Sequence, residues 1–113
     1  MFNSILIVCT GNICRSPMGE RYLRKVLLGK IIDSAGTGAL IDHSADETAK
    51  YVASSNGVSL EGHKGKQFTS SMGRQYDLIL VMEKKHIEEI GHMAPEVRGK
   101  VMLFGHWLGQ REI

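Results

Sequence analysis

The sequence lacks any long apolar run, and no stretch approaches the roughly 20 residues that a membrane-spanning helix needs. The apolar run at residues 5–8 is short and has no positively charged lead-in, so it does not resemble a signal peptide. Charge of one sign is also scarce, because 14 basic side chains face 12 acidic ones, for a net charge of +2. Without a basic tail or a run of like charges, nucleic acid is not expected as a partner. These absences predict a cytoplasmic protein that does not insert into membranes.

Cysteine is rare as well, and the two cysteines, Cys9 and Cys14, lie too close in sequence to staple a fold. A reducing setting is therefore expected. The five histidines are scattered and no Cys or His pair has ligand spacing, so neither a metal nor another cofactor is predicted. Each histidine is expected at the surface or at the rim of a site. The chain also lacks repeats and linkers, and residues 1–113 are expected to form a single domain.

What the sequence does contain is a regular alternation of apolar and amphipathic segments. The apolar segments predict strands, and they lie at residues 5–8, 31–32, 78–82 and 101–104. Helical patterns separate them, beginning near Pro17, after Asp46 and at Lys84. This order predicts an α/β fold with a four-stranded parallel sheet and helices on both faces. In such a sheet a ligand site lies beyond the carboxyl ends of the strands.

Local patterns give further expectations about the first helix and the second strand. Ser16 is expected to cap the first helix, with Pro17 in its first turn. Helical spacing predicts one face turned inward and one turned to water. The inward face consists of Met18, Tyr22, Leu23, Val26 and Leu27, and the outward face of Glu20, Arg21, Arg24 and Lys25. The glycine-rich residues 34–38 are interpreted as a loop at the end of the second strand.

The most informative stretch is residues 8–17, Val-Cys-Thr-Gly-Asn-Ile-Cys-Arg-Ser-Pro, between the first strand and the first helix. A loop that opens into a helix gathers backbone N–H groups around an anion. A thiol near a helix N-terminus and a cation ionises more readily, and Arg15 follows Cys9 by six positions. The Arg15 guanidinium can also grip two oxygens of a phosphate. A phosphate bound there would lie beside a thiolate, which suits displacement through a phosphocysteine.

The smaller residues of this stretch fit the same chemistry. Gly11 allows the backbone to approach a phosphate closely, and Asn12 suits a positive-φ position or bracing hydrogen bonds. The Ser16 hydroxyl could stabilise the thiolate as it leaves. Simpler interpretations exist, because a cysteine that ends a strand is commonly a small buried apolar residue. The Gly-Lys-Ser/Thr of a nucleotide-binding loop and the G-x-G-x-x-G of a dinucleotide site are both absent from this turn.

Residues 8–17 resemble the signature loop of the low-molecular-weight protein tyrosine phosphatases. The similarity continues through residues 33–37, 59–63, 76–83 and 94–105, and covers nearly the whole chain. These later blocks resemble the bacterial branch that dephosphorylates tyrosine kinases of capsule and exopolysaccharide export. The resemblance implies a phosphatase that acts on phosphotyrosine in a protein, with a bacterial tyrosine autokinase as the expected partner.

By the same resemblance, Cys9 is the nucleophile, Arg15 the phosphate clamp, and Ser16 the group that assists departure of the thiolate. The implied backbone donors to phosphate are Thr10, Gly11, Asn12, Ile13, Cys14 and Arg15, and Asn12 also braces the loop. Leu40 is a candidate wall against the phosphotyrosine ring, or else an incidental apolar residue of a loop. Cys14 matches a second cysteine that forms a reversible disulfide with the nucleophile, or else packs under the loop.

The sequence departs from the family after its last strand. The family carries its general acid there in an Asp-Pro-Tyr loop, followed by a long helix, and neither is found before Ile113. Proton donation to the leaving group contributes about 10²–10⁴-fold in rate, so impaired turnover is expected. The carboxyl groups that could substitute belong to Asp42, Asp46, Glu83 and Glu112, and none lies in a matching motif.

The missing helix would lie beside the first helix, over the third and fourth strands. Alternate residues of 78–82 and 101–104 are therefore expected to be bare, which predicts self-association. Two other functions remain open. One is a catalytically weak phosphate- or phosphotyrosine-binding module. The other is arsenate reduction, which needs a downstream cysteine relay, and no cysteine follows Cys14.

Overall fold

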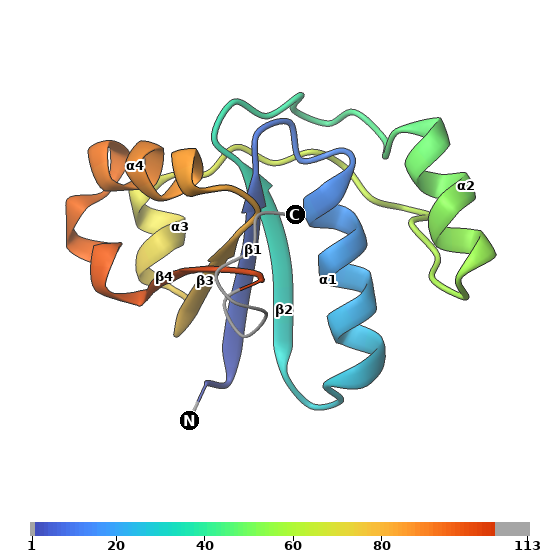
Figure 1. Ribbon diagram of the computed structural model, residues 1–113, viewed down its shortest axis with the longest axis horizontal. Helices are drawn as coiled ribbons and strands as arrows, with labels where there is room; N and C mark the ends of the chain where they lie inside the picture. The colour runs from blue at the N-terminus through green and yellow to red at the C-terminus, as the bar shows by residue number, and fades with distance from the viewer. Residues whose placement is uncertain (1, 106–113) are drawn as a thin grey trace.

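The computed structural model describes residues 2–105 and contains one parallel sheet (Figure 1). Its strands, in the spatial order β2-β1-β3-β4, are β1 (Ser4–Cys9), β2 (Ile31–Gly36), β3 (Leu78–Val81) and β4 (Val101–Leu103). The connections carry α1 (Arg15–Val26), α2 (Glu47–Ser55), α3 (Ser70–Arg74), α4 (Lys84–Met93) and the 3-10 helix η1 (Pro95–Lys100). The predicted α/β fold with a four-stranded parallel sheet is confirmed.

The register of the sheet places the end of β1 at its centre. Cys9 pairs with Gly36 of β2, and Val8 pairs with Val81 of β3. Because the strands are parallel, the segments that follow β1, β2 and β3 all leave the sheet at the same edge. Residues 9–16, which we call the 9–16 loop, leave from the middle of that edge.

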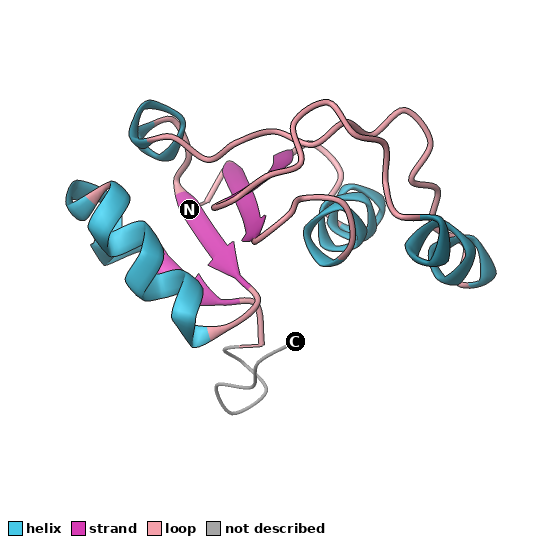
Figure 2. Cartoon of the chain, turned by 90° about the horizontal axis from the view of Figure 1, so that it is seen from above, coloured by secondary structure: helices cyan, strands magenta, loops and turns pink. Residues whose placement is uncertain are grey.

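Helices cover both faces of the sheet, as predicted, and Figure 2 shows the strands between two groups of helices. On one face α3, α4 and η1 enclose a core of Leu6, Val8, Ala35, Phe68, Ile79, Val81, Ile90, Ala94, Val97 and Leu103. On the other face α1 covers Ile5, Ile7, Cys9, Ile32, Leu78, Leu80 and Met82. Helix α2 packs beside α1 through a small cluster that includes Ala49 and Ala53.

The predicted faces of α1 are partly wrong. Glu20, expected in water, is 2% exposed, whereas Tyr22 and Val26, expected inside, are 51% and 50% exposed. The Glu20 carboxylate accepts hydrogen bonds from Ser34 Oγ at 2.7 Å and from Arg21 Nε at 2.8 Å. A buried carboxylate with such partners is tolerated. Helical spacing could not show that a polar strand residue lies opposite this side of the helix.

Two local expectations are also wrong. Helix α1 begins at Arg15 after Cys14 and has no side-chain cap, so Ser16 lies inside the first turn instead of capping it. Residues 34–36, expected in a loop, continue β2, because Ser34, Ala35 and Gly36 pair with the last residues of β1.

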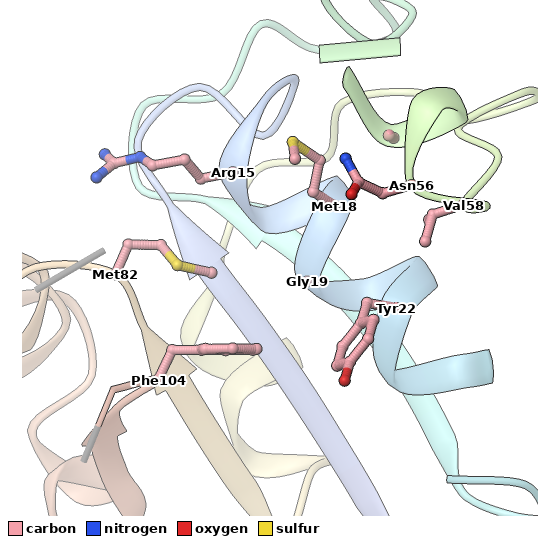
Figure 3. Close-up of a pocket in the computed structure, with 9 residues that line it drawn as sticks. Arg15, Met18, Gly19, Tyr22, Asn56, Val58, Met82 and Phe104 are labelled. Carbon is pink, nitrogen blue, oxygen red and sulfur yellow. The ribbon is translucent and has the colours of Figure 1, made fainter. Parts of the chain in front are cut away.

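The sheet face beside α1 is better covered than the sequence predicts. Leu78, Leu80 and Met82, expected to be bare, are at most 5% exposed, because they pack with β1, β2 and α1. Met102 and Phe104 of the last segment stay partly exposed. A hollow of about 290 Å³ lies beside Phe104. Figure 3 shows Phe104 and Met82 on one side of this hollow, and Met18 and Tyr22 of α1 on the other.

Residues 2–105 contain neither a membrane-spanning helix nor a cluster of metal ligands. No helix in this range is long and apolar enough to cross a membrane. No group of three His, Cys, Asp or Glu side chains in the same range could hold a metal ion.

Candidate active site

The 9–16 loop brings its thiol and its hydroxyl together. Cys9, at the end of β1, is buried and carries a free thiol. Its Sγ lies 2.9 Å from Oγ of Ser16 in the first turn of α1. Asn12 Nδ2 donates to the same Oγ at 2.9 Å, which leaves the hydroxyl proton of Ser16 for the sulfur. The two side chains thus form a continuous chain of hydrogen bonds from Asn12 through Ser16 to the sulfur.

The carbonyl groups of the loop are held from outside. Backbone N–H groups between residues 37 and 46 donate, at 2.8 to 3.0 Å, to the carbonyl oxygens of Cys9, Thr10, Gly11 and Ile13. His63 Nε2 donates to the carbonyl of Asn12 at 2.6 Å. Among residues 2–105, the N–H groups of residues 11–14 donate to no protein acceptor. Outward carbonyls and unengaged N–H groups are the arrangement that binds an anion.

Asn12 adopts the geometry expected for it. Its φ is +58°, and its side chain is fully buried. Besides donating to Ser16, it accepts from the N–H of Lys66 at 2.8 Å through Oδ1. The side chain therefore ties the loop to a segment more than fifty residues further along the chain.

Arg15, at the other end of the loop, forms an ion pair with Glu83, directly after β3. The distance from Arg15 Nη2 to Glu83 Oε2 is 2.6 Å. In Figure 3 the guanidinium extends away from Met18 and Tyr22, on the side where Met82 lies, and Arg15 is one of the residues that line the apolar hollow. The hydrogen bond from Arg15 holds the pKa of Glu83 below its ordinary value. Glu83 is therefore ionised at neutral pH and is a poor proton donor.

Of the other carboxyl groups suggested by the sequence, the structure describes those of Asp46 and Asp42. Asp46 caps α2, where its Oδ2 accepts from the N–H of Ala49 at 3.1 Å. Asp42 is exposed and has a φ of +64°. Glu112 lies outside the described residues.

Leu40 and Cys14 both lie at the exposed surface near the loop. Leu40 is 44% exposed, and its N–H donates to the carbonyl of Gly11 at 3.0 Å, which keeps it beside the loop. Cys14 is exposed and carries a free thiol, so the interpretation that it packs under the loop is wrong. Partial burial and then Asp46 raise the pKa of Cys14.

The sequence missed two histidines. His63 and His86, expected at the surface or at a rim, are at most 5% exposed, and both bond to the loop. His86 Nε2 lies 3.0 Å from Oγ1 of Thr10, and its Nδ1 accepts from the N–H of Glu83 at 3.1 Å. A signal was available, because residues just after a buried strand reach the edge where the neighbouring strands end.

Known proteins share this arrangement of sequence and fold. The family described as low molecular weight phosphotyrosine protein phosphatase matches residues 4–112. The phosphatase Etp of Escherichia coli K12 is 62% identical over 112 residues, which are 99% of this chain and 76% of Etp.

Two solved structures are also similar to this chain. The tyrosine phosphatase Wzb of Escherichia coli K30, in complex with sulphate, is 64% identical with a TM-score of 0.98, over 100% of this chain and 79% of Wzb. The tyrosine phosphatase AmsI of Erwinia amylovora is 58% identical with a TM-score of 0.97, over 100% of this chain and 75% of AmsI. With a matching family over residues 4–112 and these relatives, the chain belongs to the low-molecular-weight phosphotyrosine protein phosphatase family.

Proposed function

We propose that this chain hydrolyses phosphotyrosine in proteins through a phosphocysteine on Cys9. The observation that carries the proposal is the 9–16 loop itself. Its thiol lies 2.9 Å from a hydroxyl donor, and the N–H groups of residues 11–14 have no protein acceptor within the described range. Arg15 lies at the end of the loop, where its guanidinium forms an ion pair with Glu83. Relatives that are 62% and 56% identical to this chain are named protein-tyrosine-phosphatases.

The reaction follows from these positions in two displacements. The Cys9 thiolate attacks phosphorus, a sulfur–phosphorus bond forms, and the bond to the tyrosyl oxygen breaks with its electron pair on oxygen. Water then attacks phosphorus, inorganic phosphate leaves, and the electron pair returns to sulfur as thiolate. Loop N–H groups and Arg15 bind the three non-bridging oxygens, where charge is held in both transition states. The Ser16 hydroxyl stabilises the thiolate as it departs.

We further propose that the first displacement is slow in the 113-residue chain for poor leaving groups. The sequence contains no Asp-Pro-Tyr motif, and Glu83 is ionised beside Arg15. On this proposal the tyrosyl oxygen leaves without a proton from an Asp-Pro-Tyr aspartate or from Glu83. We expect p-nitrophenyl phosphate to be hydrolysed about 10²-fold faster than a phosphotyrosine peptide. Equal and fast turnover of the two substrates would show that another group donates the proton.

Trapping the intermediate separates an enzyme from a binding module. Rapid acid quench with p-nitrophenyl phosphate should leave a phosphoryl group on Cys9, found by mass spectrometry. Cys9→Ser should abolish both the adduct and turnover, whereas the matched variant Cys14→Ser should retain both. If inorganic phosphate binds and no adduct forms, the chain is a phosphate-binding module, the alternative that the missing acid favours.

We propose Leu40 as a wall for the phosphotyrosine ring, because it is exposed and hydrogen-bonded to the loop backbone. Leu40→Ala should raise the KM for a phosphotyrosine peptide several-fold. It should leave inhibition by inorganic phosphate unchanged, since phosphate has no ring. A parallel weakening of both would place Leu40 in loop support instead.

We propose that the partner is the phosphorylated tail of a bacterial tyrosine autokinase. We also propose that the chain acts in the cytoplasm, where free thiols such as those of Cys9 and Cys14 persist. We also propose that residues 1–113 fold as one domain and that two copies associate over the apolar surface of Tyr22, Val26 and Phe104. Tyr22 and Phe104 line the same hollow, and Tyr22 and Val26 of α1 are each half-exposed. Light scattering at rising concentration should show a dimer. A monomer at all concentrations would contradict the association.

A further inference from the structure

The first turn of α4 contacts the 9–16 loop at both of its ends. Glu83, just before the helix, pairs with Arg15 at the end of the loop. His86, one turn later, reaches Thr10 at the start of the loop, directly after the nucleophile. A single rigid element therefore holds the two residues between which a phosphate would lie.

The hydrogen bonds of His86 determine its tautomer. Its Nδ1 accepts from the backbone N–H of Glu83 at 3.1 Å, so Nδ1 carries no proton. In a neutral ring the proton is then on Nε2, which donates to Thr10 Oγ1 across 3.0 Å. The ring is fully buried, and both nitrogens have partners. A donor held this way has one orientation.

The surroundings of His86 keep the ring neutral. Burial lowers the pKa of His86 below its ordinary value. The carboxylates of Glu89 and Glu83 raise this pKa by a smaller amount, and the cations of Arg15 and Lys85 lower it further. The imidazole thus serves as a fixed neutral donor near the loop.

From this geometry we propose that His86 is a positioning residue, which orients Thr10 and with it the first peptide groups of the 9–16 loop for phosphate binding. The inference rests on the proposed function, because its effect is on phosphate bound by the loop. Thr10 is held on its other side, where its carbonyl accepts from the N–H of Gly38 at 3.0 Å. If His86 were removed, the bond from Gly38 would be the one remaining hydrogen bond that joins Thr10 to a residue outside the loop, among the hydrogen bonds of residues 2–105.

Two conservative variants separate the two hydrogen bonds of the ring. In His86→Asn the amide oxygen replaces Nδ1, so the bond from the Glu83 N–H is kept and the bond to Thr10 is lost. In His86→Gln the amide nitrogen reaches the place of Nε2, so the bond to Thr10 is kept and the bond at the start of the helix is lost. A structural role and a positioning role therefore predict opposite orders for the two variants.

Binding is measured by the protection that inorganic phosphate gives Cys9 against alkylation by iodoacetamide, and stability by thermal unfolding. We expect His86→Asn to weaken phosphate protection about five- to tenfold, the size of one hydrogen bond. His86→Gln should stay within about twofold of the parent chain, although it has the lower Tm. If phosphate protection instead ranks the two variants in the same order as their Tm values, with His86→Asn binding phosphate more tightly than His86→Gln, then His86 has only a structural role and the proposal fails.

Thr10→Val provides an independent test, because it removes the hydroxyl from an exposed side chain and leaves the buried ring in place. It should weaken phosphate protection as much as His86→Asn, and the double variant should be no weaker than either. Additive losses, or no loss in Thr10→Val, would overturn the proposal. His92→Asn, an exposed histidine on the same helix, is the matched control and should behave as the parent chain. A parent chain that phosphate does not protect would instead contradict the proposed function.

Discussion

The 9–16 loop and the apolar surface beside Phe104 are built in opposite ways. In the loop, Asn12 is fully buried with partners on both ends of its amide, and the carbonyl groups of residues 9–13 all accept hydrogen bonds. Beside Phe104, apolar side chains of α1 and of the last strand segment surround a hollow and remain partly exposed. One region is held by directional bonds and the other by non-directional contact.

This difference predicts how each region responds to substitution. A buried polar group that loses its partner costs its full desolvation energy, whereas a half-exposed apolar group loses only part of its burial. The loop should therefore be intolerant and its failures should affect phosphate binding. The apolar surface should tolerate change, and substitutions there should affect stability and the proposed self-association but not phosphate binding.

The largest effect is expected at Gly36, where β2 meets the loop. A Cβ on Gly36 would lie 2.2 Å from the carbonyl oxygen of Thr10, a backbone atom that cannot move without the loop. Gly36→Ala should lower the free energy of unfolding by about 3 kcal/mol and displace the loop. Urea unfolding and phosphate protection of Cys9 measure the two effects. Gly38→Ala is the matched control, since its Cβ would meet only Thr10 Cγ2 at 3.8 Å. Equal stability of the two variants would show that the loop yields easily.

Asn12→Ala is expected to come next. It leaves Ser16 Oγ and the N–H of Lys66 without their partner and removes a side chain suited to a φ of +58°. The loss should be about 2–3 kcal/mol of unfolding free energy, with weakened phosphate protection. Asn56→Ala, whose exposed amide bonds only to the carbonyl of Val52, should cost far less.

Phe104→Ala tests the other side of the comparison. A fully buried phenylalanine costs about 3–5 kcal/mol on truncation, and for the partly exposed Phe104 we expect about 1–2 kcal/mol. Phosphate protection of Cys9 should not change. If Phe104→Ala destabilises the chain more than Asn12→Ala, or weakens phosphate binding, the two regions are not independent and the comparison fails.

The smallest effect is a pH dependence from His86. Burial lowers its pKa below 6.5 in the folded chain, so the unfolded chain binds more protons between the folded pKa and about 6.5. The free energy of unfolding should therefore fall as the pH drops through this window. His86→Gln and His86→Asn should each remove that slope in urea titrations at pH 7.5 and 5.5. An unchanged slope in both variants would assign it to groups other than His86.

Local patterns predicted the centre of the fold and of the site. An apolar run at residues 5–8, a polar turn and Pro17 define a strand, a loop and a helix without reference to the remainder of the chain. The Asp46 cap of α2 is equally local, because its side chain bonds to an N–H three residues away. The resemblance added roles for Cys9 and Arg15 that remain proposals.

What local patterns missed depends on partners far along the chain. Glu20 is buried because Ser34 lies opposite it, and His86 is buried because β3 pairs with β1. Periodicity describes a helix face as apolar or polar, but it does not say which neighbouring element that face meets. Leu78, Leu80 and Met82 were expected to be bare because a helix was missing, but side chains of β1, β2 and α1 pack against them.

The sequence by itself determined the type and order of the elements and the chemistry of the 9–16 loop, since these depend on residues within a few positions of one another. Only the tertiary structure decided which groups hold that loop. Parallel pairing of β1 with β3 places Glu83 and His86 at its two ends, and the segments around residues 40 and 65 bind its carbonyl groups and Asn12. These contacts join residues 28 to 76 positions apart, so they depend on how the chain folds back on itself and not on neighbouring residues.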